Sequence, residues 1–248
     1  MKSVCFFMGV GLSLLSMEVQ ASGYKINTGE LAPFSYRSAE TKELKGVVHD
    51  VLMEIQKRLG TQVKPKLLPW PRAIQDSTGN KVVTFPLARV PYREDKYHWV
   101  GPIAVDHHIF AVKGGYKGAF TRLSQLKNLK VGVLKDAPPH RFLKKEGFGK
   151  IKTVTRTSLL SNMLVQNRID SWYDLKAIID FNMRLAGYEA DRVKTAYNHE
   201  IIRLYIGFSL DLKAEALRWQ EKFEEMKRDD SYNGILGKYK FSNQADSF

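Results

Sequence analysis

The residues that could carry chemistry in this sequence are scattered and form no recognised catalytic motif. The chain contains no G-x-S-x-G nucleophile elbow, no phosphate-binding glycine loop and no H-E-x-x-H metal helix. Its two adjacent histidines, His107 and His108, would point to opposite faces of a strand and so do not suit one metal ion. Carboxylates such as Glu30 and Asp174 leave acid–base catalysis open as a minor alternative. These patterns favour a protein that binds without catalysis, with no metal and no cofactor.

Composition excludes further classes of function. The chain has 248 residues, 39 Lys and Arg against 26 Asp and Glu, and one cysteine. A single thiol cannot form a disulfide framework or a cysteine-rich zinc site. The formal net charge of +13 admits nucleic acid, an anionic surface or an acidic ligand as the partner. With 44% hydrophobic residues, the chain is expected to form one large or two medium globular domains.

The first 21 residues have the pattern of a secretory signal peptide. A basic start precedes an apolar run over residues 4–15, and Val19 and Ala21 supply the small side chains of a cleavage site. The apolar run is too short for a permanent transmembrane helix, and an N-terminal core helix is the alternative. We expect cleavage after Ala21, which removes Cys5 and places the mature protein in the periplasm. Export argues against a nucleic-acid partner.

Alternating strands and helices must position any binding residues. Apolar residues at helical spacing over 47–59, followed by Gly60, predict a helix. Further strand–helix units predict an α/β fold with largely parallel sheets. The predicted strands begin at 23–27 and continue with 63–68, 81–85, 130–134 and 169–173, and the other helices cover 71–75, 158–166, 212–227 and 233–239.

Two long extended segments, near 100–112 and 196–208, have room to pass between two lobes. The chain also carries a succession of short motifs, namely GELAPFSY (29–36), GVVHDV (46–51), PWPRA (69–73), RVPYRE (89–94), LKNLKVGV (126–133), NRID (167–170) and MKRDD (226–230). Their order resembles that of periplasmic solute-binding proteins of family 3, the amino-acid ABC transporter type. The resemblance runs from about residue 23 to residue 242.

The resemblance implies an α/β, two-lobed periplasmic-binding-protein-like (type II) fold with two hinge strands. Residues 22–105 and 202–248 would form lobe 1, and residues 106–201 would form lobe 2. The implied function of this monomer is to capture a small amino-acid-like or other polar organic ligand between the lobes and present it to a membrane permease. The alternative is a ligand-sensing receptor that partners a signalling protein, and a lesser one is a dehydratase-type enzyme on the same fold.

The resemblance also implies which side chains contact the ligand. The family's carboxylate-binding arginine matches Arg93, and Arg89 is the second candidate, since a guanidinium offers paired donors to a carboxylate. A solvated Arg–Glu pair is the alternative. The family aspartate that binds the ligand ammonium lies within one position of Asp174, which could instead cap a helix. Aromatic walls, or core residues in the alternative, are expected from Phe34, Tyr36, Trp70 and Tyr173.

Two local features depart from the usual pattern. Residues 135–139 read KDAPP where typical relatives present a Gly-Ser/Thr loop. The positive charge concentrates over residues 113–156, which contain twelve Lys and Arg against Asp136 and Glu146. We expect this segment to form a solvated lysine-rich face, and the alternative is a docking face for an anionic membrane surface or an acidic partner.

Overall fold

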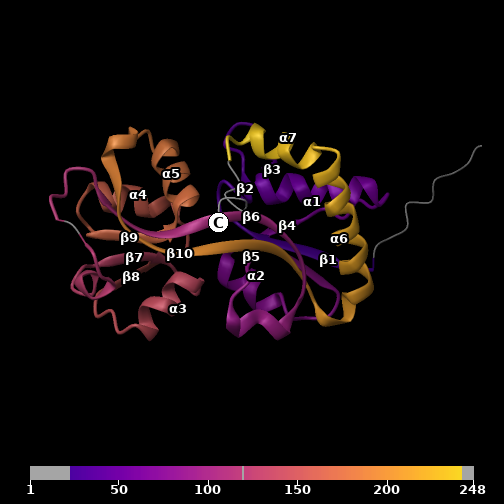
Figure 1. Ribbon diagram of the computed structural model, residues 1–248, viewed down its shortest axis with the longest axis horizontal. Coiled ribbons are helices and arrows are strands. Elements are labelled where there is room, and N and C mark those ends of the chain that lie inside the picture. The colour runs from indigo at the N-terminus through magenta and orange to yellow at the C-terminus, as the bar shows by residue number, and fades with distance from the viewer. Residues whose placement is uncertain (1–22, 119, 242–248) are drawn as a thin grey trace, which may run out of the picture.

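The protein folds into two α/β lobes that two long strands connect (Figure 1). The structure is a computed structural model that describes residues 23–118 and 120–241. The predicted signal peptide, with its cleavage site after Ala21, lies outside these described residues. In Figure 1 the right-hand lobe combines the beginning and the end of the chain, and the left-hand lobe contains its middle. The predicted α/β two-lobed fold with two hinge strands is therefore confirmed.

The connecting strands are β6 (His98–Lys113) and β10 (Val193–Phe208), which pair antiparallel along almost their whole length. They correspond to the two long extended segments predicted from the sequence. The predicted lobe boundaries fall within these strands, close to where Ile202 lies opposite Asp106. Because both crossings are hydrogen-bonded strands, ordered backbone joins the lobes.

One eight-stranded mixed sheet runs through both lobes. Besides β6 and β10 it contains β1 (Lys25–Gly29), β4 (Lys66–Leu68), β5 (Val82–Ala88), β7 (Val131–Leu134), β8 (Ile151–Val154) and β9 (Ser171–Leu175). The order across the sheet is β4-β1-β5-β10-β6-β9-β7-β8. β5, with the sequence VVTFPLA, is buried at every position, as expected for a strand that is covered on both faces. A separate ribbon pairs β2 (Tyr36–Arg37) with β3 (Leu44–Lys45).

Helices pack against both faces of the sheet (Figure 1). They are α1 (Val47–Arg58), α2 (Trp70–Asp76), α3 (Pro138–Lys145), α4 (Ser158–Val165), α5 (Lys176–Leu185), α6 (Lys213–Arg228) and α7 (Ser231–Lys238), with 3-10 turns η1 (Pro91–Lys96), η2 (Leu123–Leu126), η3 (Ala190–Arg192) and η4 (Leu210–Leu212). The predicted helix over 47–59 is α1, and its periodic residues Val47, Val51 and Ile55 are fully buried. The other four predicted helices correspond to α2, α4, α6 and α7.

Two helices were not predicted, α3 and α5, and the strand β8 was also missed. α3 begins at Pro138 and Pro139, which suit a first helical turn because the N–H groups there have no partner within the helix. α5 receives its cap from another strand: Asp106 Oδ2 on β6 accepts a 2.8 Å hydrogen bond from the Ala177 N–H. The prolines read as a loop signal, and the cap of α5 cannot be read from local sequence.

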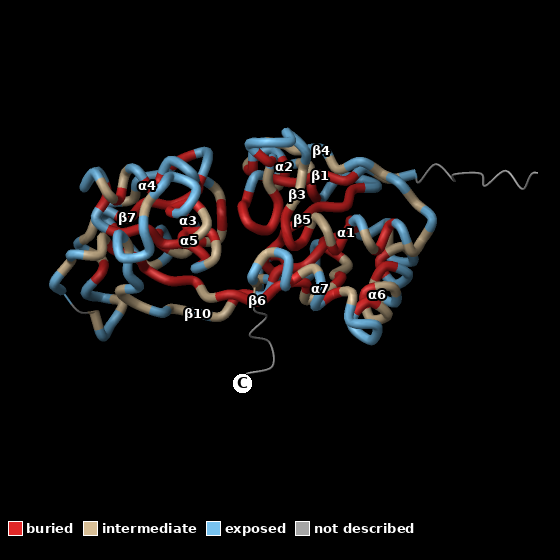
Figure 2. The backbone as a smooth tube through the Cα atoms, turned by 90° about the horizontal axis from the view of Figure 1, so that it is seen from above, coloured by how far each residue is buried: buried red, intermediate tan, exposed pale blue. Residues whose placement is uncertain are grey.

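The hydrophobic core follows the sheet from lobe 1 into lobe 2, and buried backbone lies along the strands in Figure 2. A second cluster of buried side chains fills the α3 side of lobe 2. It consists of Phe110, Leu126, Val131, Val133, Leu143, Phe148 and Tyr173. Lobe 2 therefore has apolar packing on both faces of its strands, which holds the strand ends in place.

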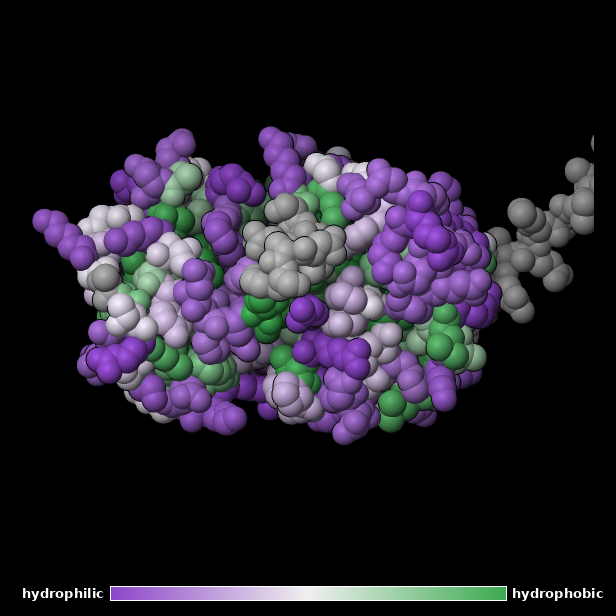
Figure 3. Space-filling view, viewed as in Figure 1, coloured by the Kyte–Doolittle hydropathy of each residue, from purple (hydrophilic) through white to green (hydrophobic). Residues whose placement is uncertain are grey.

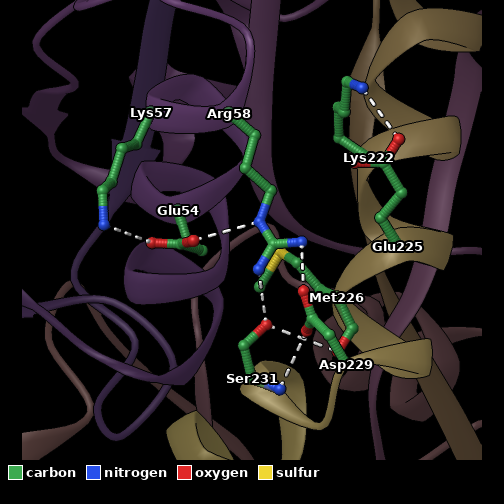
Figure 4. Close-up of polar contacts among 8 residues, drawn as sticks. All are labelled: Glu54, Lys57, Arg58, Lys222, Glu225, Met226, Asp229 and Ser231. Atoms are coloured by element: carbon green, nitrogen blue, oxygen red, sulfur yellow. Dashed lines mark hydrogen bonds and ion pairs between the residues drawn. The ribbon is translucent and has the colours of Figure 1, made fainter.

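A polar clamp fastens the C-terminal helices of lobe 1 to α1 (Figure 4). The Arg58 guanidinium donates hydrogen bonds to Asp229 (2.7 Å), Ser231 (2.8 Å) and Glu54 (3.0 Å). These contacts connect the end of α1 to the α6–α7 junction. The motif at residues 226–230 therefore helps to hold α6 and α7 against α1 within lobe 1.

The surface that faces the viewer in Figure 3 is largely hydrophilic. Within residues 23–118 and 120–241, no helix is long and apolar enough to cross a membrane. None of the Lys and Arg side chains of residues 113–156 is buried, which fits the expected solvated face. A docking role for this face stays a prediction.

Candidate ligand-binding site

Two side-chain contacts join the lobes away from the hinge strands. Tyr92, in η1 after β5, packs under Arg141 of α3, with the guanidinium carbon 5.2 Å from the ring centre. Tyr36, in β2, packs against Phe181 of α5 with ring centres 4.9 Å apart. Each of these segments follows the carboxyl end of a strand, which is where α/β folds form ligand crevices. The two contacts mark the region between the lobes as the candidate site.

Arg93 is buried beside the first of these contacts, and only 3% of its surface is exposed. Its Nη1 donates a long, 3.3 Å hydrogen bond to the Ala88 carbonyl, and its guanidinium lies 5.4 Å from the Tyr92 ring centre. Burial, with a smaller contribution from repulsion by Arg141, lowers the pKa of Arg93. No carboxylate of the described residues pairs with it. Most of its five N–H donors are therefore free for a ligand.

Arg89 occupies a different environment, although it lies only one turn away in sequence. Its guanidinium forms a two-donor ion pair with Glu94 and lies over the rings of Trp99 and Tyr205. The side chain is 39% exposed. This is the Arg–Glu surface pair that the sequence left as the alternative, and Nε and Nη2 of Arg89 both donate to Glu94. The structure does not bring Arg89 together with Arg93.

Asp174 is the last but one residue of β9 and is 5% exposed. It accepts a 2.9 Å hydrogen bond from the Leu175 N–H and a longer one, 3.4 Å, from the Trp172 indole. Burial raises the pKa of Asp174 to about 6. The helix-capping role that the sequence left open belongs to Asp106, which binds the Ala177 N–H of α5. Asp174 is therefore a buried carboxylate without an ion-pair partner in the described structure, and it could accept a cationic group.

The four predicted aromatic residues divide into core and interlobe positions. Phe34 and Tyr173 are fully buried: Phe34 packs on Phe241, and Tyr173 stacks on Phe110 with ring centres 4.1 Å apart. Both residues therefore lie in the core, which was the alternative to a ligand wall in the sequence analysis. Tyr36 is partly exposed and reaches across to lobe 2.

Trp70 begins α2 and packs so closely on Gly29 that a Cβ there would lie 2.6 Å from the indole. The indole is 4% exposed, and its Nε1 has no hydrogen-bond partner among the residues that the structure describes. An unpaired buried donor at a strand end is a candidate for ligand contact. Its place after β4 is where the sequence predicted it.

A polar cluster lies on the lobe 2 side of the hinge and was not predicted. His108 Nδ1 lies 3.1 Å from Glu200 Oε1, and Tyr173 Oη lies 2.6 Å from His199 Nδ1. The hydrogen bond with His108 lowers the pKa of Glu200, whereas burial lowers that of His199. Across the described residues, no group of three or more His, Cys, Asp or Glu could hold a metal ion. The cluster links the two hinge strands to β9.

The sequence profile of the bacterial extracellular solute-binding proteins, family 3, matches residues 26–243. The chain belongs to this family. Membership of family 3, which the motif succession indicated, is therefore confirmed, and the amino-acid ABC transporter type stays a prediction. The family description places its members outside the cytoplasm. Compared with curated protein sequences, this family 3 protein has no significant match.

Solved structures share the fold of this family 3 protein at low sequence identity. A histidine kinase sensor domain similar to periplasmic binding proteins aligns with a TM-score of 0.79 and 14% identity, over 87% of this chain and 95% of that chain. An ancestral arginine-binding protein bound to arginine aligns with a TM-score of 0.77 and 22% identity, over 87% of this chain and 97% of that chain. The ancestral amino acid-binding protein that is a precursor of cyclohexadienyl dehydratase aligns with a TM-score of 0.75 and 18% identity, over 87% of this chain and 94% of that chain.

Sequence reasoning missed three residues of the interlobe region, Tyr92, Arg141 and Phe181. Tyr92 directly precedes Arg93, so the motif that pointed to the arginine contained a usable signal. Arg141 follows the KDAPP segment, whose departure from the family pattern marked this loop as unusual. Phe181 lies on α5, which was not predicted, and no local signal could have placed it opposite Tyr36.

Proposed function

We propose that this protein captures a small, carboxylate-bearing, amino-acid-like or other polar organic ligand between its lobes and presents it to a membrane transporter. The observation that carries the proposal is the buried guanidinium of Arg93, which has one long hydrogen bond and no carboxylate partner among the described residues. A buried cation without a counter-ion is costly, and a ligand carboxylate would remove that cost with paired, charge-assisted hydrogen bonds.

The lobes supply complementary charges for such a ligand. Arg93 belongs to lobe 1 and would bind the carboxylate, whereas Asp174 at the end of β9 would face an ammonium or other cationic group. Burial holds the pKa of Asp174 at about 6, and a cation beside it would favour the ionised carboxylate. Trp70, with its unpaired indole donor, and Tyr36 would complete the walls.

Binding would act by shifting the balance between open and closed arrangements of the lobes. A ligand that contacts both lobes favours closure by about 1.4 kcal/mol for each tenfold preference for the closed form. No bond is made or broken in this function, and we propose no turnover. The family membership and the fold of the arginine-bound ancestral protein support it.

A second candidate is a ligand-sensing receptor for a signalling partner. Its support is the likeness in fold to a histidine kinase sensor domain, with a TM-score of 0.79. Deleting the gene separates the two: a transport component is needed for uptake of the labelled ligand, whereas a sensor leaves uptake unchanged and abolishes the transcriptional response.

The ligand is sought by thermal shift of the protein purified from the periplasm, against amino acids, opines, polyamines and short peptides. A ligand at about 100 times its dissociation constant adds about 2.7 kcal/mol of stability. Calorimetry then compares Arg93→Ala with Arg218→Ala, an exposed arginine of α6 that serves as the matched control. We expect at least about a tenfold loss of affinity for Arg93→Ala alone. Equal affinities would overturn the assignment of Arg93.

A further inference from the structure

The guanidinium groups of Arg93 and Arg141 both pack on the ring of Tyr92, although they belong to different lobes. Their central carbons lie 5.4 Å and 5.2 Å from the ring centre of Tyr92. Arg93 comes from η1 in lobe 1, and Arg141 comes from α3 in lobe 2. The two cations are close enough for Arg141 to lower the pKa of Arg93. In this arrangement of the lobes, two like charges therefore lie on either side of the junction.

No acidic side chain of the described protein compensates this pair. The Arg93 guanidinium has only its hydrogen bond to the Ala88 carbonyl, and the Arg141 guanidinium forms no hydrogen bond or ion pair with a described residue. The helix that carries Arg141 has the sequence PPHRFLKK, without an acidic residue. Asp136, the acidic residue just before this helix, lies beside His140, and Glu94 of η1 is engaged by Arg89. The junction of the lobes therefore holds two positive charges without an acidic partner among the described residues, Arg93 being buried and Arg141 exposed to solvent.

We propose that the ligand is a small dicarboxylate, acidic amino acids included, with one carboxylate bound by Arg93 and the other by Arg141. This inference rests on the proposed function, because it names the ligand class of the same site. A guanidinium offers a planar fork that takes a whole carboxylate through two parallel hydrogen bonds. A single carboxylate shared by both arginines would fill neither fork and would leave one positive charge unbalanced. Two carboxylates satisfy both forks and make the closed junction neutral.

The same geometry assigns Arg141 a role in selecting the closed form. A monocarboxylate on Arg93 contacts lobe 1 and leaves the repulsion between the arginines in place. A dicarboxylate connects the arginines and so connects the lobes. Charge count at the ligand, rather than size alone, therefore decides closure, because a ligand shifts a conformational equilibrium only by its differential affinity for the two forms.

Calorimetry with matched probe pairs tests this proposal. Glutamate and glutarate carry two carboxylates, whereas glutamine replaces one carboxylate of glutamate with an amide and pentanoate replaces one carboxylate of glutarate with a methyl group. We expect the two dicarboxylates to bind at least about tenfold more tightly than their partners, which corresponds to about 1.4 kcal/mol. We expect Arg141→Gln to abolish this preference and Arg141→Lys to restore part of it. Lys144→Gln, an exposed cation of the same helix, controls for overall charge and should keep the preference.

The outcomes separate this inference from the function on which it rests. If monocarboxylates bind through Arg93 and the dicarboxylates bind no better, the binding function stands and the dicarboxylate assignment is overturned. If Arg141→Gln and Lys144→Gln weaken the binding of dicarboxylates equally, general electrostatic attraction explains the preference and the role of Arg141 is overturned. If neither the monocarboxylates nor the dicarboxylates bind the wild-type protein, both the function and the ligand class are overturned.

Discussion

The rings of Tyr36 and Phe181 pack with their centres 4.9 Å apart and thereby join β2 of lobe 1 to α5 of lobe 2. The two residues lie in segments that are far apart in the chain. Their contact exists only when the lobes approach, so it stabilises the closed arrangement without belonging to either core. An aromatic pair of this kind contributes about 1 kcal/mol beyond the area it buries.

We therefore expect Phe181→Ala to weaken ligand affinity about fivefold while the melting temperature changes little. Calorimetry gives the affinity, and small-angle scattering of the ligand-loaded protein reports whether the lobes are further apart. Leu185→Ala, at a 62% exposed position of the same helix, is the matched control and should bind normally. An equal loss in both variants would show that helix propensity, not the interlobe contact, matters.

Asp174→Asn should stabilise the ligand-free protein at neutral pH. Burial raises the pKa of Asp174 from 3.8 to about 6, so the folded state holds its proton more tightly than the unfolded state. Its contribution is complete below pH 3.8 and is lost as the pH rises through about 6, a difference of about 3 kcal/mol. Asp174→Asn does not lose stability in this way, because the asparagine side chain does not ionise. Urea titrations at pH 4 and pH 7.5 should show its advantage only at the higher pH.

The same variant should lose affinity for ligands that carry an ammonium group. A stability gain together with an affinity loss is the signature of a residue kept for binding. Unchanged affinity for an ammonium ligand would remove Asp174 from the site and leave it a buried structural carboxylate.

Arg58→Ala should destabilise the protein by about 2 kcal/mol, because it removes three hydrogen bonds at the junction of α1, α6 and α7. Lys57→Ala, at the neighbouring 80% exposed side chain, removes only a surface pair with Glu54 and should change stability by less than about 0.5 kcal/mol. Chemical denaturation measures both. Similar values for the two would mean that Arg58 is no more than a surface charge.

Asp50 should make the protein sensitive to acid. Burial alone would raise its pKa, but hydrogen bonds with His49, Lys238 and Tyr239 outweigh burial and lower it to about 2. The stability that Asp50 contributes is therefore present above its ordinary value of 3.8 and is lost as the pH falls towards 2.

Between pH 5 and pH 2, the wild-type protein should lose about 2 kcal/mol through this group, and Asp50→Asn should lack that part of the decline. Denaturation at a series of pH values measures the slope. Glu43→Gln, at an exposed position near β3, should follow the wild-type curve. A wild-type slope in Asp50→Asn would contradict the role of this carboxylate.

The sequence predicted those parts of the fold that local periodicity encodes. The helix over residues 47–59 repeats apolar side chains at helical spacing, and the hinge strands are long and extended, so both could be read directly. α5 could not, because its first turn is completed by Asp106 from a strand distant in the chain. α3 opens with two prolines, which read equally well as a loop.

The candidate site shows the same division. The motif indicated Arg93 as the candidate for binding a carboxylate, which stays a prediction. The motif could not separate Arg93 from Arg89, whose partners Glu94 and Tyr205 are set by the fold. The sequence could not distinguish Phe34 in the core from Phe34 in a ligand wall. Only the fold shows that this side chain is buried and packs against Phe241. Contacts between lobes, such as Tyr92 with Arg141, lie beyond any local pattern.

The position of β10 between β5 and β6 also governs the order in which the protein can fold. Ala88 of β5 finds its partner Leu204 only after the chain has built the whole of lobe 2. Until then the apolar β5 has one open edge, which is a template for pairing with another chain. Lobe 2 can assemble as soon as it emerges, whereas lobe 1 waits for the last part of the polypeptide. A chain that stops early leaves this edge uncovered and is prone to aggregate.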